Sequence, residues 1–338
     1  MKAYRIRAAG GIDSLTLAEE AAAPLGAGQI RLRVRAVSLN FRDLMIADGR
    51  YPAGGARPVI PGSDAVAEVI ELGAGATRWR LGDRVATSFF PHWHAGAADP
   101  RNTREPFGAD ADGVLAQEIV VSEDSVFAVP AHLDDAQAAT LTCAGVTAWN
   151  ALFVEARLRP GQSVLLLGTG GVSIWGLQLA KAAGLRAIVT SSSDAKLERA
   201  RALGADATIN YRTHPEWQDE VLRLTGGAGV DAVLEVGGSG TLTRSVRAAA
   251  MNGTVAIIGG VSGFGGDLDA IALIMGAKRL SGIFVGSRAM GEDLARFVEV
   301  NRIVPVVDRS FAFEQAREAY RYLESGSHFG KVTIQVAG

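Results

Sequence analysis

The stretch from Val164 to Gly184, VLLLGTGGVSIWGLQLAKAAG, constrains the fold more than any other part of the chain. Its first four residues form an unbroken apolar run, which is typical of a strand buried on both faces of a parallel sheet. A glycine-rich turn follows, and apolar residues then recur at helical spacing until Gly184, a residue suited to a helix C-cap. A second apolar run, residues 187–190, comes next. This order of strand, glycine turn, helix and strand predicts a doubly wound α/β domain that binds a dinucleotide.

The glycine turn supplies the first candidate cofactor-binding residues. Glycines let the backbone approach a pyrophosphate, and the free N–H groups at the start of the helix face its negative charge. Ser173 stands where the third glycine of the G-x-G-x-x-G pattern is expected, and a turn without a ligand is the alternative interpretation. The candidate residues are Gly168, Thr169, Gly170, Gly171 and Val172.

Composition limits the classes of protein to consider. The chain has 338 residues, enough for two domains, and a net charge of −2, so neither nucleic acid nor an anionic membrane is expected as a partner. The first residues lack a signal-peptide core, and no apolar run reaches about 18 residues, so we expect a cytoplasmic protein. The one cysteine, Cys143, excludes an internal disulfide and a zinc site built from several cysteines.

The remaining pattern predicts two domains. Residues 1–129 are β-rich, with a short helix at 40–45 after a polar cap and a long polar loop at 92–112. From residue 134 helices alternate with strands, including a helix at 136–156, a helix at 242–251 and a strand at 281–285. The tail contains a helix at 313–325 and an edge strand at 331–336. We therefore assign residues 1–129 with 302–338 to a β-rich domain and residues 130–301 to the dinucleotide-binding domain.

Five short stretches, taken in order, resemble the medium-chain dehydrogenase/reductase superfamily. They are Asn40–Leu44, Pro61–Asp64, Cys143–Ala148, Gly168–Val172 and His328–Lys331. The resemblance covers essentially the whole chain and is greatest to the zinc-free branch, which includes quinone oxidoreductases and enoyl reductases. It implies a GroES-like β-rich catalytic domain and a Rossmann cofactor domain with a doubly wound parallel sheet.

The resemblance also implies that the protein holds no metal. Zinc-dependent relatives have a cysteine where Asn40 stands, Gly-His-Glu where Gly62-Ser63-Asp64 stands, and their third ligand where Cys143 stands. One thiolate with an amide and a hydroxyl does not make a closed zinc site. The loop at 92–112 has no cysteine for a structural zinc, although its two histidines are an alternative metal site. Cys143 is interpreted as a small buried residue beside the substrate rather than as a nucleophile.

The end of the second strand favours NADPH (NADP⁺) over NAD(H). NAD-binding sites place an acidic residue there, whereas this chain has hydroxyls, among them Ser191 and Ser192, which leave room for a 2′-phosphate. Lys196 would add a positive charge, and the alternative is a solvated surface lysine. Asp194 is interpreted as the N-cap of the following helix. Tyr211 matches in place a tyrosine that joins the lysine at the 2′-phosphate in similar quinone oxidoreductases.

Further cofactor contacts are implied by the resemblance alone. Thr147 is expected near the nicotinamide, and Val236 and Gly237 close a strand at the adenine side of the cofactor. Two further groups end strands whose backbone binds the nicotinamide carboxamide: Gly259, Gly260 and Val261, and Phe284, Val285 and Gly286. Ordinary turn chemistry is the alternative explanation for the glycines.

Without zinc, another group must polarise or protonate the acceptor of the hydride. Tyr51 is the candidate acid, because its spacing from Asn40 resembles that of enoyl reductases; a rim tyrosine is the alternative. Asn40 would hold a carbonyl oxygen or a water. Arg42 would stabilise an enolate, or pair with Asp43 or Asp64. The expected substrate pocket also includes Ser63, Asp64 and Cys143, together with an aromatic wall of Phe89, Phe90, Trp93 and Phe107. Core or surface packing would explain the aromatic residues equally well.

These residues predict an NADPH-dependent, zinc-free oxidoreductase that reduces a small conjugated carbonyl, a quinone or an enone. A secondary alcohol or carbonyl oxidoreductase is the second candidate, and a non-enzymatic NADPH-binding structural protein is a candidate of another class. The apolar segment 280–285 near the sheet edge predicts a homodimer, because an uncovered apolar edge strand tends to pair.

Overall fold

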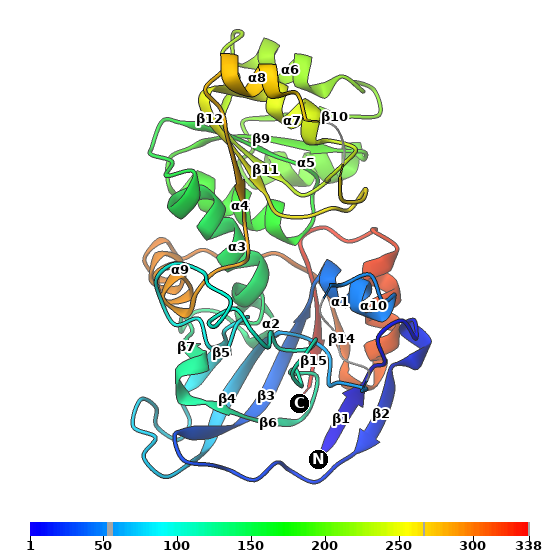
Figure 1. The fold of residues 1–338 in the computed structure, drawn as a ribbon, viewed down its shortest axis with the longest axis vertical. Coiled ribbons are helices and arrows are strands. Elements are labelled where there is room, and N and C mark those ends of the chain that lie inside the picture. Colours follow the sequence, from blue (N-terminus) through cyan, green and yellow to red (C-terminus); the bar gives the residue numbers. More distant parts are fainter. Residues whose placement is uncertain (53–56, 266–267, 337–338) are drawn as a thin grey trace. The chain divides into compact units, whose positions relative to one another are not determined.

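The computed structural model describes residues 1–52, 57–265 and 268–336, and the chain forms two compact units (Figure 1). Unit 1 comprises residues 1–146 and 285–338, and unit 2 comprises residues 147–284.

Unit 1 is built on a seven-stranded sheet in the order β14-β15-β3-β4-β5-β7, with β6 also paired to β3. The long strand β3 (Gln29–Leu39) alternates apolar and basic residues, and its apolar side chains are fully buried. The other strands are β4 (Asp64–Leu72), β5 (Arg84–Thr87), β6 (Glu118–Ser122), β7 (Val126–Ala128), β14 (Val307–Ala312) and β15 (Lys331–Gln335), besides the separate pair β1 (Lys2–Arg5) and β2 (Thr16–Glu19). The helices are α1 (Phe41–Ala47), α2 (Asp135–Ala138), the π-helix η3 (Leu141–Gly145), α9 (Arg288–Asn301) and α10 (Ala316–Glu324).

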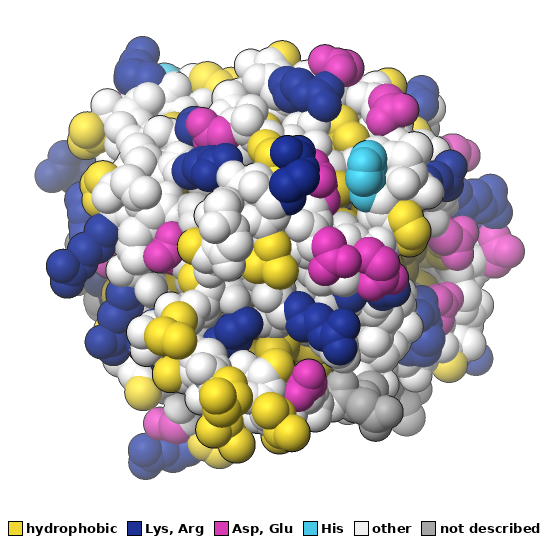
Figure 2. All heavy atoms as spheres, turned by 90° about the horizontal axis from the view of Figure 1, so that it is seen from above, with side chains coloured by type: hydrophobic (Ala, Val, Ile, Leu, Met, Phe, Trp, Pro, Cys, Tyr) yellow, Lys and Arg dark blue, Asp and Glu magenta, His cyan; other side chains and the backbone are white. Residues whose placement is uncertain are grey.

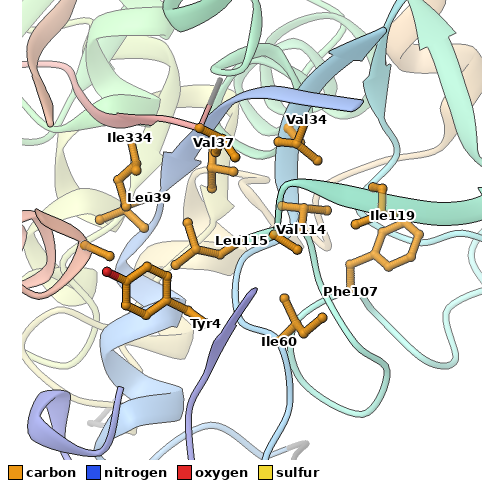
Figure 3. Close-up of a cluster of buried hydrophobic side chains, with 14 of the residues drawn as sticks. Tyr4, Val34, Val37, Leu39, Ile60, Phe107, Val114, Leu115, Ile119 and Ile334 are labelled. Carbon is orange, nitrogen blue, oxygen red and sulfur yellow. The ribbon is translucent and has the colours of Figure 1, made fainter. Parts of the chain in front are cut away.

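The core of unit 1 joins distant parts of the sequence. Figure 3 shows Val34, Val37 and Leu39 of β3 beside Ile334 of β15, with Leu115 below them. All five are at most 1% exposed, so burial of the C-terminal strand against β3 closes this unit.

The tail differs from the expectation in one respect. The strand expected at the edge, β15, lies inside the sheet between β14 and β3, and β14 forms the edge. β14 is not evident from the sequence, because polar residues interrupt its apolar pattern in VDRSFA.

Unit 2 contains a six-stranded, entirely parallel sheet in the order β10-β9-β8-β11-β12-β13. In order of sequence this is 3-2-1-4-5-6, the order of a doubly wound dinucleotide-binding sheet, which confirms the expected α/β class. Its strands are β8 (Ser163–Leu166), β9 (Arg186–Ser191), β10 (Ala207–Asn210), β11 (Val230–Glu235), β12 (Ala249–Ile257) and β13 (Arg279–Gly282). Its helices are α4 (Gly171–Ala182), α5 (Asp194–Ala202), α6 (Trp217–Leu224), α7 (Leu242–Ala248) and α8 (Ala270–Met275), after α3 (Val146–Trp149) and the π-helix η4 (Asn150–Glu155).

Three expected elements have different bounds. The helix expected at 242–251 ends at Ala248, because residues 249–251 continue into β12, which pairs with β11. The strand expected at 281–285 ends at Gly282. Val285 has a φ of +52°, which lies outside the β region of backbone conformations. The helix expected at 136–156 is divided between α2, η3, α3 and η4. Local helix propensity and apolar content did not reveal these interruptions.

The limits of the compact units differ from the predicted domain limits at residues 129 and 302. Helix α9 packs against β7 and η3, and Gly291 of α9 lies against the ring of Phe127. Residues 130–146 and 285–301 are therefore parts of unit 1 by contact. Among the described residues, no helix combines the length and apolar character that crossing a membrane requires.

Candidate active site

Helix α1 gathers three of the predicted catalytic residues. Asn40 is its N-cap, and the Asn40 N–H donates to the Asp43 carboxylate at 2.8 Å in a capping box. At the other end, the N–H groups of Arg50 and Tyr51 both donate to the Met45 carbonyl, at 2.7 and 3.2 Å. This tight turn brings Tyr51 back along the helix.

Arg42, in the first turn of α1, lies between two aromatic rings. Its Cζ is 4.9 Å from the ring centroid of Tyr51 and 4.5 Å from that of Phe89. Its Nη1 donates to the Phe107 carbonyl at 2.8 Å, and the side chain is buried. Its positive charge lowers the pKa of Asp43, although no direct ion pair joins the two in the described chain. Tyr51 is half-buried, and its hydroxyl makes no hydrogen bond to a described residue.

A buried charged cluster lies at the N-terminal end of α1. The Lys331 ammonium, on β15, donates to the side-chain Oδ1 of Asn40 at 2.6 Å and to the Leu39 carbonyl. Asp64, at the start of β4, accepts from the Ser63 hydroxyl at 2.6 Å and from the Cys143 N–H at 2.9 Å. The structure therefore brings together the predicted residues Asn40, Ser63, Asp64 and Cys143.

Lys331 was not predicted as a site residue, although its motif carried the family resemblance. Its signal was a lysine directly before the alternating apolar residues of the strand KVTIQV, where burial of the charge demands a partner. Only 4% of Lys331 is exposed, and Asp64 is not exposed at all.

The pKa values in this cluster follow from burial and from the neighbouring charges. Burial raises the pKa of Asp64, while the Lys331 ammonium opposes the rise. Burial also raises the pKa of Asp43 to about 6, against the effect of Arg42, and lowers the pKa of Lys331, against the effect of Asp64. Desolvation raises the pKa of Cys143 to about 12, so in the absence of a metal its side chain is a thiol at neutral pH and a poor nucleophile.

The predicted aromatic pocket residues are packed rather than open. Phe90 and Trp93 are 1% and 3% exposed, and the Phe90 ring lies 4.7 Å from that of Phe89. The Trp93 indole donates to the Gly96 carbonyl at 3.0 Å. In the nearby loop, His92 contacts Glu105 at 3.1 Å. The described residues contain no group of three or more His, Cys, Asp or Glu side chains arranged to hold a metal ion.

In unit 2, the predicted phosphate turn has open space around its glycines. Gly168 has a φ of +75°, and a Cβ at Gly168 or Gly170 would meet no atom within 4 Å. Gly170 is the N-cap of α4, whose first N–H groups face this space. The turn, with Thr169, Gly171 and Val172, therefore fits a dinucleotide pyrophosphate.

Two residues supply what the missing third glycine would supply. The Ser173 hydroxyl donates to the Leu167 carbonyl at 2.6 Å, which ties α4 to the end of β8. Gly176 provides the close packing, since a Cβ there would lie 2.9 Å from methyl groups of Leu166 and Leu234. Gly176 was not predicted from the sequence, although a glycine within an apolar helix indicates close packing at that position.

The predicted 2′-phosphate residues meet at the carboxyl ends of β9 and β10. Asn210 is in register with Ser191, and the Tyr211 N–H donates to the Ser191 carbonyl at 3.1 Å. Ser192 follows directly, and Lys196 lies in the first turn of α5. Asp194 is not the N-cap as expected. The cap is Ser193, which accepts from the Lys196 N–H, whereas the Asp194 carboxylate accepts from the Asn210 amide at 2.7 Å.

Glu235 organises the loop at the predicted adenine side and was missed by sequence reasoning. Its buried carboxylate accepts from the N–H groups of Gly237 and Gly238, at 2.7 and 2.9 Å, and from the hydroxyls of Thr241 and Ser245. The Val261 N–H donates to the Val236 carbonyl at 3.3 Å, so the segment 259–261, with Gly259 and Gly260, is bonded to this loop.

The remaining predicted cofactor residues are divided between the two units. In unit 2, Thr147 is 2% exposed and Phe284 is 49% exposed. In unit 1, Val285 adopts the left-handed conformation that a β-branched residue rarely tolerates, at a cost of about 1–3 kcal/mol. A Cβ at Gly286 would lie 2.6 Å from Val146, so this segment has no room for a side chain.

Comparisons with known proteins agree with both units. The model of the alcohol dehydrogenase GroES-like domain matches residues 26–131, and that of the zinc-binding dehydrogenase family matches residues 171–300. A zinc-type alcohol dehydrogenase-like protein of Schizosaccharomyces pombe is 40% identical over 333 residues, which cover 96% of each chain. The chain belongs to the medium-chain dehydrogenase/reductase superfamily. As in its relatives, a GroES-like domain is joined to a Rossmann-like domain.

Solved structures of this superfamily bear on the cofactor. An NAD-dependent alcohol dehydrogenase has a TM-score of 0.91 and 32% identity, with 100% of both chains covered. A crotonyl-CoA carboxylase/reductase, AntE, solved in complex with NADP, has a TM-score of 0.87 and 26% identity, with 99% of this chain and 94% of that chain covered. These similarities support an oxidoreductase with a nicotinamide cofactor.

Proposed function

We propose that this superfamily member is an NADPH-dependent reductase that transfers hydride to a conjugated carbonyl, a quinone or an enone, without zinc. The contact between the Lys331 ammonium and Asn40 is the observation that carries this proposal. A position that supplies a zinc ligand in zinc-dependent relatives is occupied here by an amide bonded to a buried cation. The second such position is Ser63, whose hydroxyl is bonded to Asp64, and the third is a thiol at neutral pH.

The bound cofactor would supply the hydride, and the chain would bind and orient it. The turn at 168–172 and the start of α4 would hold the pyrophosphate. Ser191, Ser192, Lys196 and Tyr211 would hold the 2′-phosphate, and the engagement of Asp194 by Asn210 favours this use of the strand end. Tyr51 would donate the proton, and Arg42 would stabilise the negative charge that develops on the substrate oxygen.

Reduction of a carbonyl group, or oxidation of a secondary alcohol, is the second candidate function. It is favoured by the S. pombe relative, whose name is zinc-type alcohol dehydrogenase-like protein. The name of one structural neighbour also makes NAD(H) the alternative cofactor.

A substrate panel tests the proposal directly. Oxidation of NADPH and of NADH is followed at a matched concentration with quinones, enones, ketones and secondary alcohols, the last with oxidised cofactor. We expect turnover with NADPH and an enone or quinone. Turnover confined to alcohols and ketones would establish the second candidate, and preference for NADH would refute the cofactor assignment.

We also propose a homodimer that forms through the edge strand β13 of unit 2. Beside it, α8 exposes apolar side chains: Ile271, Ile274 and Met275 are 73%, 76% and 74% exposed. Figure 2 views the face of unit 2 on which α6 and α8 lie, and hydrophobic side chains gather near its lower edge. An apolar patch of this kind is typical of a protein interface. The cytoplasmic location stays a prediction.

A further inference from the structure

We propose that Lys331 is a positioning residue for this reduction: its ammonium fixes the Asn40 amide and, through it, the start of helix α1, which carries Arg42 and whose Met45 carbonyl accepts from the backbone of Tyr51. This inference rests on the proposed function and adds a residue from the C-terminal tail to the site.

The hydrogen-bonding chemistry defines how Asn40 is held. An ammonium group only donates, so the Asn40 atom 2.6 Å from Lys331 must be the carbonyl oxygen Oδ1 rather than the amide nitrogen. The same ammonium donates to the carbonyl of Leu39, the preceding residue. Two bonds from one side chain therefore hold both the backbone and the side chain at the entry to α1.

The other side of Asn40 faces a carboxylate. The Asn40 amide lowers the pKa of Asp64, although its Nδ2 makes no hydrogen bond to a described residue. The Asn40 side chain is 9% exposed and lies between a cation and an anion. This placement gives Asn40 a structural task in the site, that of transmitting the position of Lys331 to the helix.

The fixed helix start determines where the two candidate catalytic side chains lie. Arg42 follows Asn40 by two residues, and its guanidinium stacks on the Tyr51 ring. The backbone of Tyr51 is bonded to Met45 on the same helix. A shift or fraying of the first turn would move both side chains, and a displacement of about 1 Å can lower a rate on the order of 10²-fold.

The cluster also joins segments that are far apart in sequence. Lys331 connects β15 to α1, and Asp64 connects the start of β4 to η3 through the Cys143 N–H. The Thr87 hydroxyl donates to the Ser63 carbonyl at 2.8 Å, and the Thr142 hydroxyl donates to the Thr87 carbonyl at 2.7 Å. By the family resemblance, zinc-dependent relatives join positions 40, 63 and 143 through a metal. Here an ammonium, a carboxylate and neutral hydrogen bonds connect the same segments.

Removal of the Lys331 charge would change the electrostatic environment of the buried groups around it. The charged and titratable groups that act on Lys331 are Asp64, Cys143 and Asp43. With Lys331 neutral, the buried Asp64 carboxylate would lose the positive charge that opposes the rise of its pKa. The Asn40 Oδ1 would lose the ammonium that donates to it, and the side-chain amide would be free to rotate.

The test is a double-mutant cycle of Lys331→Met and Asn40→Ala, with NADPH as cofactor and the best carbonyl substrate of the panel. We expect Lys331→Met to lower kcat on the order of 10²-fold, with the NADPH dissociation constant unchanged, because Lys331 is bonded to Leu39 and Asn40 within unit 1, whereas the phosphates of the cofactor are assigned to residues of unit 2. In the Asn40→Ala background the same substitution should lower kcat by a clearly smaller factor, since only the bond to the Leu39 carbonyl is then left to lose. Lys331→Arg, which keeps the cation, should restore kcat to within about tenfold of wild type.

Lys181→Met is the matched control. The Lys181 ammonium likewise binds one backbone carbonyl, of Leu185, and one side-chain oxygen, of Asp206, but it lies in unit 2 at the end of α4. It should lower stability without lowering kcat. Equal losses of kcat from Lys331→Met in both backgrounds, or a loss of stability with normal kcat, would overturn the proposal. If Lys331→Met does not fold, Lys331→Gln, which retains a neutral donor, replaces it in the same cycle.

One readout does not depend on activity. The side-chain amide resonance of Asn40, assigned by its loss in Asn40→Ala, should shift in Lys331→Met and keep its position in Lys181→Met. If the panel finds no carbonyl substrate but this shift is seen, the proposed function fails while the positioning contact stands. An unchanged resonance would refute the contact itself.

Discussion

The guanidinium carbon of Arg42 lies 4.9 Å from the centroid of the Tyr51 ring, so the candidate oxyanion-binding group and the candidate acid are in direct contact. Nine positions separate the two residues, and the turn at Met45 brings them together. The contact fixes the ring plane of Tyr51 while its hydroxyl makes no hydrogen bond to any residue that the structure describes. A positioned ring whose hydroxyl has no hydrogen-bond partner within the described part of the chain suits a proton donor.

The first prediction concerns Tyr51→Phe, which keeps the ring and removes the hydroxyl. General acids contribute typically ~10²–10⁴-fold to a rate, so kcat on an enone should fall by that factor with NADPH affinity unchanged. A quinone should suffer less, because solvent can protonate its phenolate product. Tyr322→Phe is the control, since the Tyr322 hydroxyl is bonded to Asp308 and belongs to α10. A rise in KM alone would show that Tyr51 only lines the pocket.

The second prediction concerns Lys196→Ala at the start of α5. Loss of a charge-assisted contact with the 2′-phosphate is worth about 1.5–3 kcal/mol, or roughly ten- to a hundredfold in affinity. Fluorescence titration should therefore show weaker NADPH binding and nearly unchanged NADH binding. Equal weakening of both cofactors would assign Lys196 a structural role, and no change would place the phosphate elsewhere.

The third prediction concerns metal. Elemental analysis of freshly purified protein should find substoichiometric zinc, and incubation with a chelator should leave the reduction of the carbonyl substrate unchanged. The basis is the donor set, in which Asn40 is bonded to Lys331 and Ser63 to Asp64. One zinc per chain, with activity that disappears on chelation, would contradict both this prediction and the zinc-free mechanism.

The fourth prediction uses the raised pKa of Asp43, about 6 against an ordinary value of 3.8. The folded protein binds this proton more tightly than the unfolded chain does, so Asp43 must make stability fall as pH rises from about 4 to about 6. The difference of roughly 2 pH units corresponds to about 3 kcal/mol. Asp43→Asn retains an acceptor for the Asn40 N–H and removes the titration. Urea unfolding at pH 4 and pH 7 should show that the variant gains on wild type by up to this amount; parallel pH profiles would contradict the assignment.

The sequence predicted the parts of the fold that local patterns determine. The apolar runs and glycine turn of unit 2 defined its parallel sheet, and the polar cap at Asn40 defined α1. The remaining parts of the fold depend on which strands pair across long sequence distances, and local patterns do not contain that information. β15 is internal because β14, a strand with a weak apolar pattern, pairs with its outer side. Residues 249–251 favour a helix by composition, but the register of β12 with β11 places them in a strand.

The candidate site shows the same division. The resemblance identified Asn40, Ser63, Asp64 and Cys143 as site residues; hydrogen bonds join Ser63 and Cys143 to Asp64, whereas Asn40 is bonded to Lys331. The roles of Lys331 and Glu235 depend on which donors and acceptors surround a buried charge, and no spacing in the sequence contains that information. A charged residue within an apolar strand shows that a partner must exist, without showing which one.

The last prediction concerns assembly through unit 2. Sedimentation at micromolar concentration should show a dimer, because β13 is an edge strand and the neighbouring α8 exposes Ile271, Ile274 and Met275. Burial of these side chains in a partner would contribute about 25 cal/mol for each Å² of apolar surface removed from water. Ile274→Asp places a charge in the patch and should shift the protein toward the monomer, whereas Val300→Asp, at an equally exposed position of α9 in unit 1, should leave the dimer intact. A wild-type monomer would refute the dimer, and dissociation by Val300→Asp alone would move the interface to unit 1.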